Sequence, residues 1–183
     1  MSRFELVRDA SQDSKLDEIY KEMADYGWVG SDGVPVNWVT SQGSRSDILS
    51  ATWEFTKNTM MSGQLPPTVK QLIAMVIAMQ NDCRYCEVAH TGALEAMGVP
   101  QNVIQSCASD PDLAEVPPPQ RAMLKVALKA NRDPKSVTDE DIQNLRDQGL
   151  SEGEIIEVLM VAAYAIFGDF WADVSGVVVD GEG

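Results

Sequence analysis

Two cysteines and the only histidine of the chain stand close together, at Cys83, Cys86 and His90. An α-helix turns once about every 3.6 residues, so side chains at this spacing share one face of a helix. Two cysteines that are close on a helix can form a disulfide with little backbone movement, and a nearby imidazole can carry the proton. This pattern predicts reversible thiol chemistry.

The residues before Cys83 indicate where its helix begins. Asn81 and Asp82 interrupt an apolar run, and either side chain can accept a backbone N–H of a helix that we expect from Cys83 to Met97. The N-terminus of a helix carries partial positive charge, which favours a thiolate over a thiol. Gly98 follows this segment and suits its end.

Two other interpretations of the cysteine pair stay open. Zinc binding is the main functional alternative, but three ligands on one helix need a fourth, and the chain has no second Cys/His pair. We therefore expect no metal. The pair and the histidine can also serve only in packing, which is the use that we expect for the isolated Cys107.

The rest of the chain predicts an all-α protein, because apolar residues recur at helical spacing between breakers. Helices are expected at residues 16–23, 46–63, 66–79, 103–104, 120–131, 138–148 and 151–174. A loop is expected at 27–43 and a proline-rich, acidic connector at 110–119. We expect one domain over 1–183, with an N-terminal helical segment at 1–62 and a core at 63–183.

Cap residues support several of these boundaries. Ser46 or Asp47 is expected to cap the second helix, Thr138 a later one, and Ser151 with Glu154 to form a capping box before the last helix. Residues 168–173, a polar and aromatic run near the end of that helix, are expected to serve in packing or a subunit contact.

The composition excludes several classes of partner. The net charge of −14 and the pI near 4.3 disfavour binding to nucleic acids and to anionic membranes. The first residues lack the pattern of a secretion signal, so we expect the cytosol. No glycine-rich phosphate loop follows a strand pattern, so we expect no organic cofactor.

Several segments resemble one known family. They are Leu-Pro-Pro at 65–67, Gln-Leu-Ile-Ala at 71–74, Asn-Asp-Cys-Arg-Tyr-Cys at 81–86 and Ala-His-Thr at 89–91. Together they resemble the AhpD/carboxymuconolactone decarboxylase core, and the flanking residues 34–37, 45–49, 133–138 and 149–155 resemble its peroxidase-related branch. The Cys-x-x-Cys-x-x-x-His element is the most specific part of this resemblance.

The resemblance implies an AhpD-like helical bundle with the CxxC at the start of a core helix. It implies reduction of a peroxide or disulfide, with Cys86 attacking, Cys83 resolving and His90 relaying the proton. Family peroxidases carry a glutamate where this chain has Gln71, which cannot accept a proton, and some relatives have a histidine in place of Tyr85. The resemblance also implies an external dithiol reductant and a homo-oligomer, a trimer or hexamer.

Two alternatives compete with a redox enzyme. One is a carboxymuconolactone decarboxylase-like, non-redox enzyme, although such relatives need not carry the CxxC pair. The other is a non-catalytic oligomeric protein with a vestigial site, which the amide at Gln71 favours.

Overall fold

The computed structural model describes every residue except 1, 31, 111, 113 and 183. The described residues form helices and no strand, with one isolated bridge between Val29 and Pro35, so the all-α prediction is confirmed. The chain divides into two compact units. The N-terminal unit holds Met1–Lys57 and Phe170–Gly183, and the central unit holds Asn58–Asp169.

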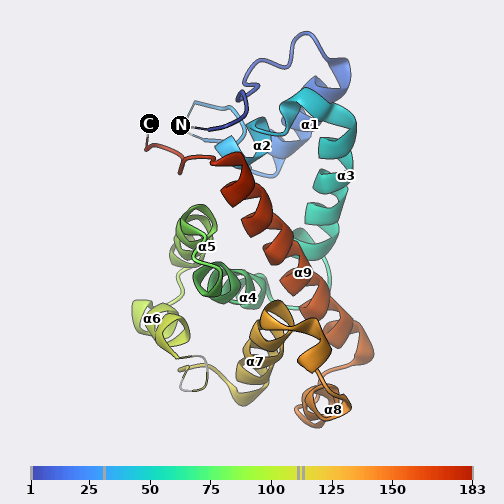
Figure 1. Cartoon of the computed structure of the whole chain (residues 1–183), viewed down its shortest axis with the longest axis vertical. Helices are drawn as coiled ribbons and strands as arrows, with labels where there is room; N and C mark the ends of the chain where they lie inside the picture. The colour runs from blue at the N-terminus through green and yellow to red at the C-terminus, as the bar shows by residue number, and fades with distance from the viewer. Residues whose placement is uncertain (1, 31, 111, 113, 183) are drawn as a thin grey trace. The chain divides into compact units, whose positions relative to one another are not determined.

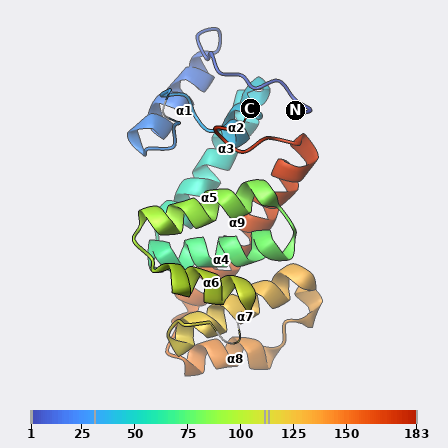
Figure 2. The same cartoon turned by 90° about the vertical axis from the view of Figure 1, so that its left-hand side faces the viewer.

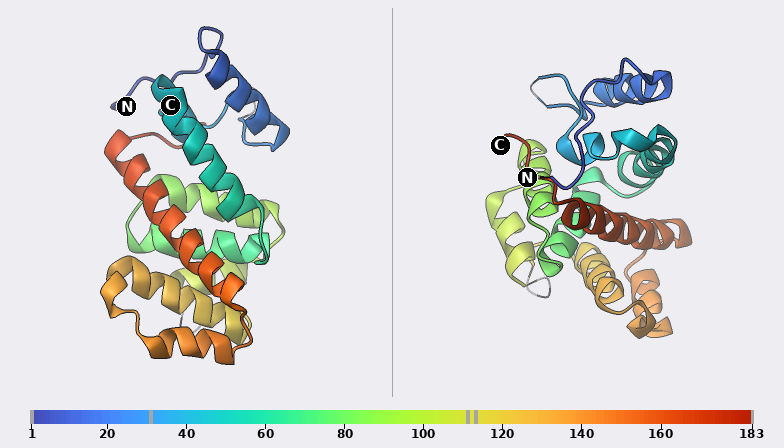
Figure 3. Two further views of the ribbon diagram at one scale, coloured as in Figure 1. Left: turned by 90° about the vertical axis from the view of Figure 1, so that its right-hand side faces the viewer. Right: turned by 45° about the horizontal axis from the view of Figure 1, so that its top comes forward.

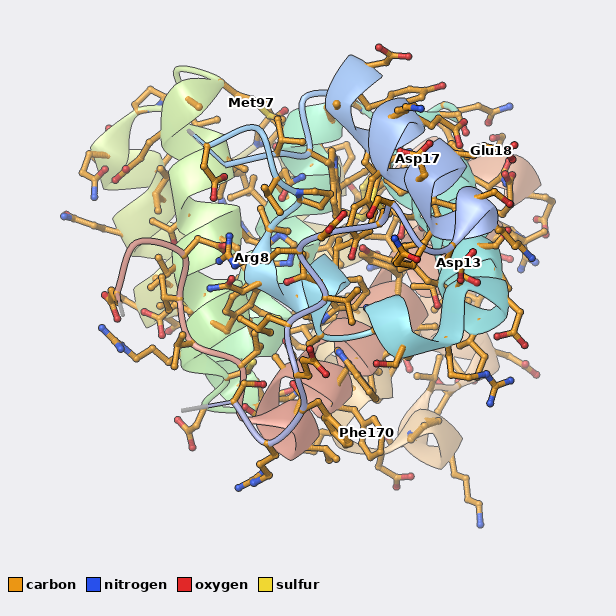
Figure 4. All side chains as sticks on the ribbon, turned by 90° about the horizontal axis from the view of Figure 1, so that it is seen from above. Arg8, Asp13, Asp17, Glu18, Met97 and Phe170 are labelled. Carbon is orange, nitrogen blue, oxygen red and sulfur yellow. The ribbon has the colours of Figure 1, made fainter. Side chains whose placement is uncertain are left out.

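The N-terminal unit contains α1 (Ser14–Asp25), α2 (Asn37–Thr40) and α3 (Ser46–Thr56), with a 3₁₀ turn at Gly43–Arg45. The predicted apolar stripe of α1 is buried, and it consists of Leu16, Ile19, Tyr20 and Met23. Asp13 caps this helix by accepting the backbone N–H groups of Lys15 and Leu16, and Figure 4 labels it with other acidic side chains of the same region. A buried stripe and a side-chain cap together explain why this segment is helical.

The central unit is built around α4 (Pro67–Gln80), which is buried nearly all round, as its continuous apolar sequence predicts. Pro67 takes the first helical position, where its missing N–H costs no hydrogen bond. The other helices are α5 (Arg84–Ala96), α6 (Gln101–Ser109), α7 (Pro118–Arg132) and α8 (Asp139–Asp147), with a 3₁₀ turn at Pro134–Ser136. Helices α4 and α5 lie side by side (Figures 1 and 2), and α6 and α7 also contact α4.

The last helix, α9 (Glu152–Ser175), is continuous and belongs to the central unit as far as Asp169 (Figure 3). It begins with the predicted capping box, in which Ser151 and Glu154 each accept the other's backbone N–H. By length and composition alone α9 is apolar enough to cross a membrane, but half of its most apolar stretch is buried inside the protein, as in the core helix of a globular domain.

A buried ion pair fixes the chain just before α4. The ammonium of Lys70 lies 2.5 Å from Oε1 of Glu157 on α9 and also donates to the backbone oxygens of Thr59 and Ser62. The same carboxylate accepts the N–H of Gln64 at 2.7 Å. Because these partners come from three separate segments, the pair ties α9 to α4 and to the loop that precedes it.

Four local predictions need correction. The expected loop at 27–43 contains the short helix α2. Helix α3 has Arg45 at its N-cap with no side-chain cap, so neither Ser46 nor Asp47 plays that part. Helix α5 likewise has Cys83 at its N-cap with no side-chain cap, so the capping predicted for residues 81–82 is wrong. The expected connector ends at Pro118, where α7 begins, and its residues 111 and 113 lie outside the described residues.

Candidate active site

The tight turn between α4 and α5 places both cysteines at the start of α5. Asp82 adopts a φ of 55°, a left-handed conformation that aspartate tolerates better than most residues, and so reverses the chain. Cys83 follows as the N-cap, with its N–H bonded to the oxygen of Ala78 at 2.9 Å and its own oxygen accepting from Glu87. Cys86 lies within the first turn, so one turn of helix carries both sulfurs.

A carboxylate from α9 completes this cluster. The sulfurs of Cys83 and Cys86 and a carboxylate oxygen of Asp169 all lie within 4.8 Å of one another. The three residues are buried, with exposed fractions of 0%, 5% and 3%. Both cysteines are free thiols. The structure therefore forms a compact dithiol–carboxylate cluster, which is the name that we use for these three side chains below.

Hydrogen bonds hold Asp169 in this position. The side-chain amide of Asn81 donates to its Oδ2 at 2.8 Å, and the thiol of Cys83 lies 3.9 Å from its backbone oxygen. An oxygen of the carboxylate also lies within 4.8 Å of the Cys86 sulfur. Gly168 brings the backbone of α9 close to Cys86, because a Cβ added there would lie 3.9 Å from the sulfur. The end of α4, the start of α5 and α9 thus meet at the two sulfurs.

The cluster favours the protonated form of Cys86. Its hydrogen bond to Cys83 raises the pKa of the Cys86 thiol, and burial and the negative charge of Asp169 raise that pKa further. A helix N-terminus alone favours a thiolate, but here burial and the acidic neighbours outweigh it. Cys86 therefore carries its proton at neutral pH, and a reaction at its sulfur must remove that proton.

His90 lies one turn beyond Cys86 on α5 and is held by α4. Its Nδ1 lies 2.7 Å from Oε1 of Gln71. An amide oxygen only accepts, so Nδ1 carries the hydrogen and Nε2 is left as the acceptor. Burial lowers the pKa of His90 to about 4, so the ring is neutral at neutral pH. Gln71 thus orients the imidazole and fixes its tautomer.

The remaining predicted residues occupy simpler positions. Tyr85 is half-buried between the two cysteines in sequence. Cys107 is fully buried on α6, and burial raises the pKa of its thiol, in agreement with the small buried residue that we expected. Sequence reasoning missed Asp169, which it assigned to packing or a subunit contact. The available signal was a single acidic residue within the otherwise uncharged run 158–172.

The donor atoms of the dithiol–carboxylate cluster are close enough to hold one soft metal ion. A structural zinc site needs four ligands, however, and in the part of the chain that the structure describes this group comprises three. We assign none of the three residues as a metal ligand.

Fold and site together define the class of the protein: an all-helical protein with a buried dithiol at the start of a core helix. The sequence profile described as "Carboxymuconolactone decarboxylase family" matches residues 46–129, which include Gln71, both cysteines of the pair and His90. Over these residues the chain is similar to this family, in agreement with the resemblance that its sequence motifs indicate. A search among curated proteins finds no match.

Solved structures share the fold over almost the whole chain. The alkylhydroperoxidase AhpD core protein of Ralstonia eutropha JMP134, described as peroxidase-related, is 24% identical, with a TM-score of 0.83 over 99% of this chain and 93% of its own. A peroxidase-related protein of Silicibacter sp. TM1040 is 19% identical, with a TM-score of 0.85 over the same shares. The debrominase Bmp8, solved as a variant with 2,3,4-tribromopyrrole, is 19% identical, with a TM-score of 0.78 over 99% of this chain and 95% of its own. At these identities the likeness establishes the fold.

Proposed function

We propose that this protein is a thiol-dependent peroxidase or disulfide oxidoreductase. The observation that carries the proposal is the pair of free thiols within 4.8 Å of each other and of a carboxylate, in the first turn of a core helix. Two such thiols give up two electrons and two protons when they form a disulfide, which is the electron count needed to reduce a peroxide or another disulfide.

The two cysteines take different roles in this cycle. Cys86 keeps a small exposed surface, whereas Cys83 keeps none, so an oxidant reaches Cys86 first. Cys86 attacks and becomes a sulfenic acid or a mixed disulfide, and Cys83 then displaces the added group to close the disulfide. These are also the roles that the family resemblance implies. An external dithiol restores the pair.

His90 and Gln71 serve the proton transfers. The neutral ring presents Nε2 as an acceptor, while the amide oxygen of Gln71 holds Nδ1–H in place. Because burial keeps the pKa of His90 near 4, the ring accepts a proton briefly and passes it on. Tyr85 lines the cysteine turn, and a shielding role for its ring rests on the family resemblance.

The experiment that tests this function is mass spectrometry of the reduced protein after one equivalent of oxidant. We expect a disulfide between Cys83 and Cys86, with Cys107 remaining a thiol. Oxidants should include hydrogen peroxide, an organic hydroperoxide, a small disulfide and a brominated pyrrole, since one structural neighbour is a debrominase. Cys107→Ser is the matched control and should form the disulfide unchanged. Thiols that stay reduced with every oxidant contradict the proposal and favour a non-redox, decarboxylase-like enzyme or a non-catalytic protein.

We also propose a homo-oligomer, trimer or hexamer, in the cytosol. Supporting evidence for self-association comes from α9, where Ile156, Met160, Ala163 and Phe167 recur at alternating steps of four and three residues. Ile156 and Met160 expose 61% and 42% of their surface. An apolar stripe at this spacing is typical of helices that pack along their length against another helix.

A further inference from the structure

We infer that Asp169 is the catalytic base of the thiol reaction and takes the proton of Cys86 as its sulfur attacks. This inference rests on the proposed function and names a residue that neither the family resemblance nor the cysteine motif supplies. Three observations carry it: the short separation between carboxylate and thiol, the hydrogen bond that orients the carboxylate, and the lack of a proton-accepting group in the side chain of Gln71.

The short separation places a proton acceptor beside the reacting atom. A carboxylate oxygen of Asp169 lies within 4.8 Å of both sulfurs, and the charge of this carboxylate raises the pKa of Cys86. Proton transfer by a side chain requires hydrogen-bond contact with the group that loses the proton. The interaction found for His90 is the one with Gln71. Of these two candidate bases, Asp169 is therefore the one that the structure shows beside the nucleophile.

Asp169 is also held as a catalytic base needs to be. It is 3% exposed, and Asn81 donates to its Oδ2 from the turn between α4 and α5. The other carboxylate oxygen, Oδ1, is also buried. A buried and oriented carboxylate needs little reorganisation when it accepts a proton, which makes it more effective than the same group in water.

The charge of Asp169 has two opposite consequences. As a negative neighbour it raises the pKa of Cys86 and so suppresses the free thiolate. As a base it accepts the thiol proton while the new bond to sulfur forms, so that no free thiolate is needed. Cys86 is therefore unreactive toward most electrophiles, because it stays protonated. It reacts with an oxidant whose leaving group can accept the thiol proton from Asp169.

The step balances for a peroxide. The sulfur of Cys86 bonds to one peroxide oxygen and the O–O bond breaks. The thiol proton passes to Asp169 and from there to the departing oxygen, which leaves as an alcohol or as water. Cys83 then attacks the sulfenic sulfur, closes the disulfide and releases water, its own proton going to the departing hydroxide. The dithiol loses two electrons, the peroxide gains two, and Asp169 ends the cycle ionised.

The test is Asp169→Asn in the full-length protein, with two measurements over a range of pH. The first is the ultraviolet absorbance of the thiolates of Cys83 and Cys86 in a Cys107→Ser background, which follows the titration of the pair. The second is the rate constant for oxidation by hydrogen peroxide. Loss of the negative charge should lower the pKa of Cys86, yet loss of the base should slow the reaction at neutral pH by about 10²–10⁴-fold. A purely electrostatic role predicts the opposite, because a more acidic thiol with a larger thiolate fraction at neutral pH reacts faster.

The outcomes separate this inference from the function on which it rests. A wild-type protein that forms no disulfide contradicts both. A reactive wild type with an Asp169→Asn variant that reacts equally fast or faster contradicts only the role of Asp169. Asp173→Asn, an exposed carboxylate one turn further along α9, is the matched control and should match the wild-type rate.

A second variant keeps the inference testable if Asp169→Asn does not fold. Asn81→Ala removes the hydrogen bond that orients Oδ2 but leaves the carboxylate in place. Misplacing the base should slow oxidation about ten- to hundred-fold, with Cys86 remaining protonated at neutral pH. An unchanged rate in this variant contradicts the inference.

Discussion

Glu157 and Asp169 are two largely buried carboxylates on one helix, near the two ends of the part of α9 that lies in the central unit. Glu157 meets the ammonium of Lys70 and the backbone N–H groups of Gln64 and Leu65. Asp169 meets two thiols and the amide of Asn81. The functional group and the helix are the same, so the partners decide the role. A cation makes the carboxylate of Glu157 a structural anchor, and two thiols make that of Asp169 a group for proton transfer.

The two carboxylates also differ in how they affect protonation. Burial opposes the ionisation of Glu157, but Lys70 and the backbone N–H groups outweigh it, so the pKa of Glu157 is lowered. At the other site the negative charge of Asp169 contributes to a raised pKa at Cys86. One site therefore stabilises a charge pair in the folded state, and the other keeps a proton available for transfer.

The largest expected effect is at the chemical site. Cys86→Ser removes the attacking sulfur and should lower peroxide turnover by about 10⁴-fold or more. Serine nearly fits the same space, so the free energy of unfolding should change by only about 1 kcal/mol. Steady-state turnover and urea denaturation measure the two quantities. Substantial remaining turnover would show that another group attacks the oxidant.

At the structural site the effect should fall on stability instead. Lys70→Met leaves Glu157 buried without its ammonium, which typically costs about 3–5 kcal/mol of unfolding free energy. The double variant Lys70→Met with Glu157→Leu should recover most of this loss, because no buried charge remains. Urea denaturation of the three proteins is the measurement.

The control for that experiment is a surface ion pair. Lys21 is 73% exposed in its side chain and pairs with Asp17 on α1, so Lys21→Met should change stability by only about 0.5 kcal/mol. If Lys70→Met is as mild as this control, the pair with Glu157 does not anchor α4.

The acid dependence of stability should single out Glu157. Its folded pKa lies below the unfolded value of about 4.3, so its contribution to stability is present above that pH and is lost as the pH falls through the folded pKa. Glu157→Gln should therefore give a shallower loss of unfolding free energy with falling pH than the wild type. Denaturation at a series of acidic pH values measures both slopes, and equal slopes would mean that the carboxylate is not stabilised on folding.

A smaller effect on the reaction rate is expected at the hydrogen bond between Gln71 and His90. Gln71→Glu places a negative charge against Nδ1 of His90, and this should raise the pKa of the ring above its present value of about 4. Because His90 is the only histidine, its ring protons give a single titration curve in NMR. A more basic ring should raise the peroxide rate by about tenfold near neutral pH. A titration curve that does not move would show that the two side chains are apart in solution.

Local signals predicted most of the fold and one half of the site. The helices expected at 16–23 and 66–79 and the capping box at Ser151 depend on residues within one or two turns of each other, and all three are confirmed. The spacing of the two cysteines is equally local.

The other half of the site depends on contacts between distant segments. Asp169 follows Cys83 by 86 positions and reaches it only because α9 packs against the turn between α4 and α5. The same contact explains the wrong prediction at Asn81, whose amide orients Asp169 instead of capping α5. Asn81 had two possible hydrogen-bond partners, the start of α5 and Asp169, and it bonds the one that tertiary packing buries. A single sequence does not reveal which partner will be chosen.

The smallest expected effect on catalysis lies on the exposed side of α9. If the stripe that contains Ile156 packs against a second copy of the chain, Ile156→Glu places like charges in that interface and should lower the oligomer mass. Glu157 and Asp169 stay buried in this variant. The rate of disulfide formation per chain should therefore remain within about twofold of the wild-type rate, and the free energy of unfolding of the separated chain within about 0.5 kcal/mol of the wild-type value. Analytical ultracentrifugation measures the mass, with Ile48→Glu on α3, also half-exposed, as the control. A mass that Ile156→Glu leaves unchanged assigns self-association to another surface, and a large loss of turnover shows that the site depends on its neighbour.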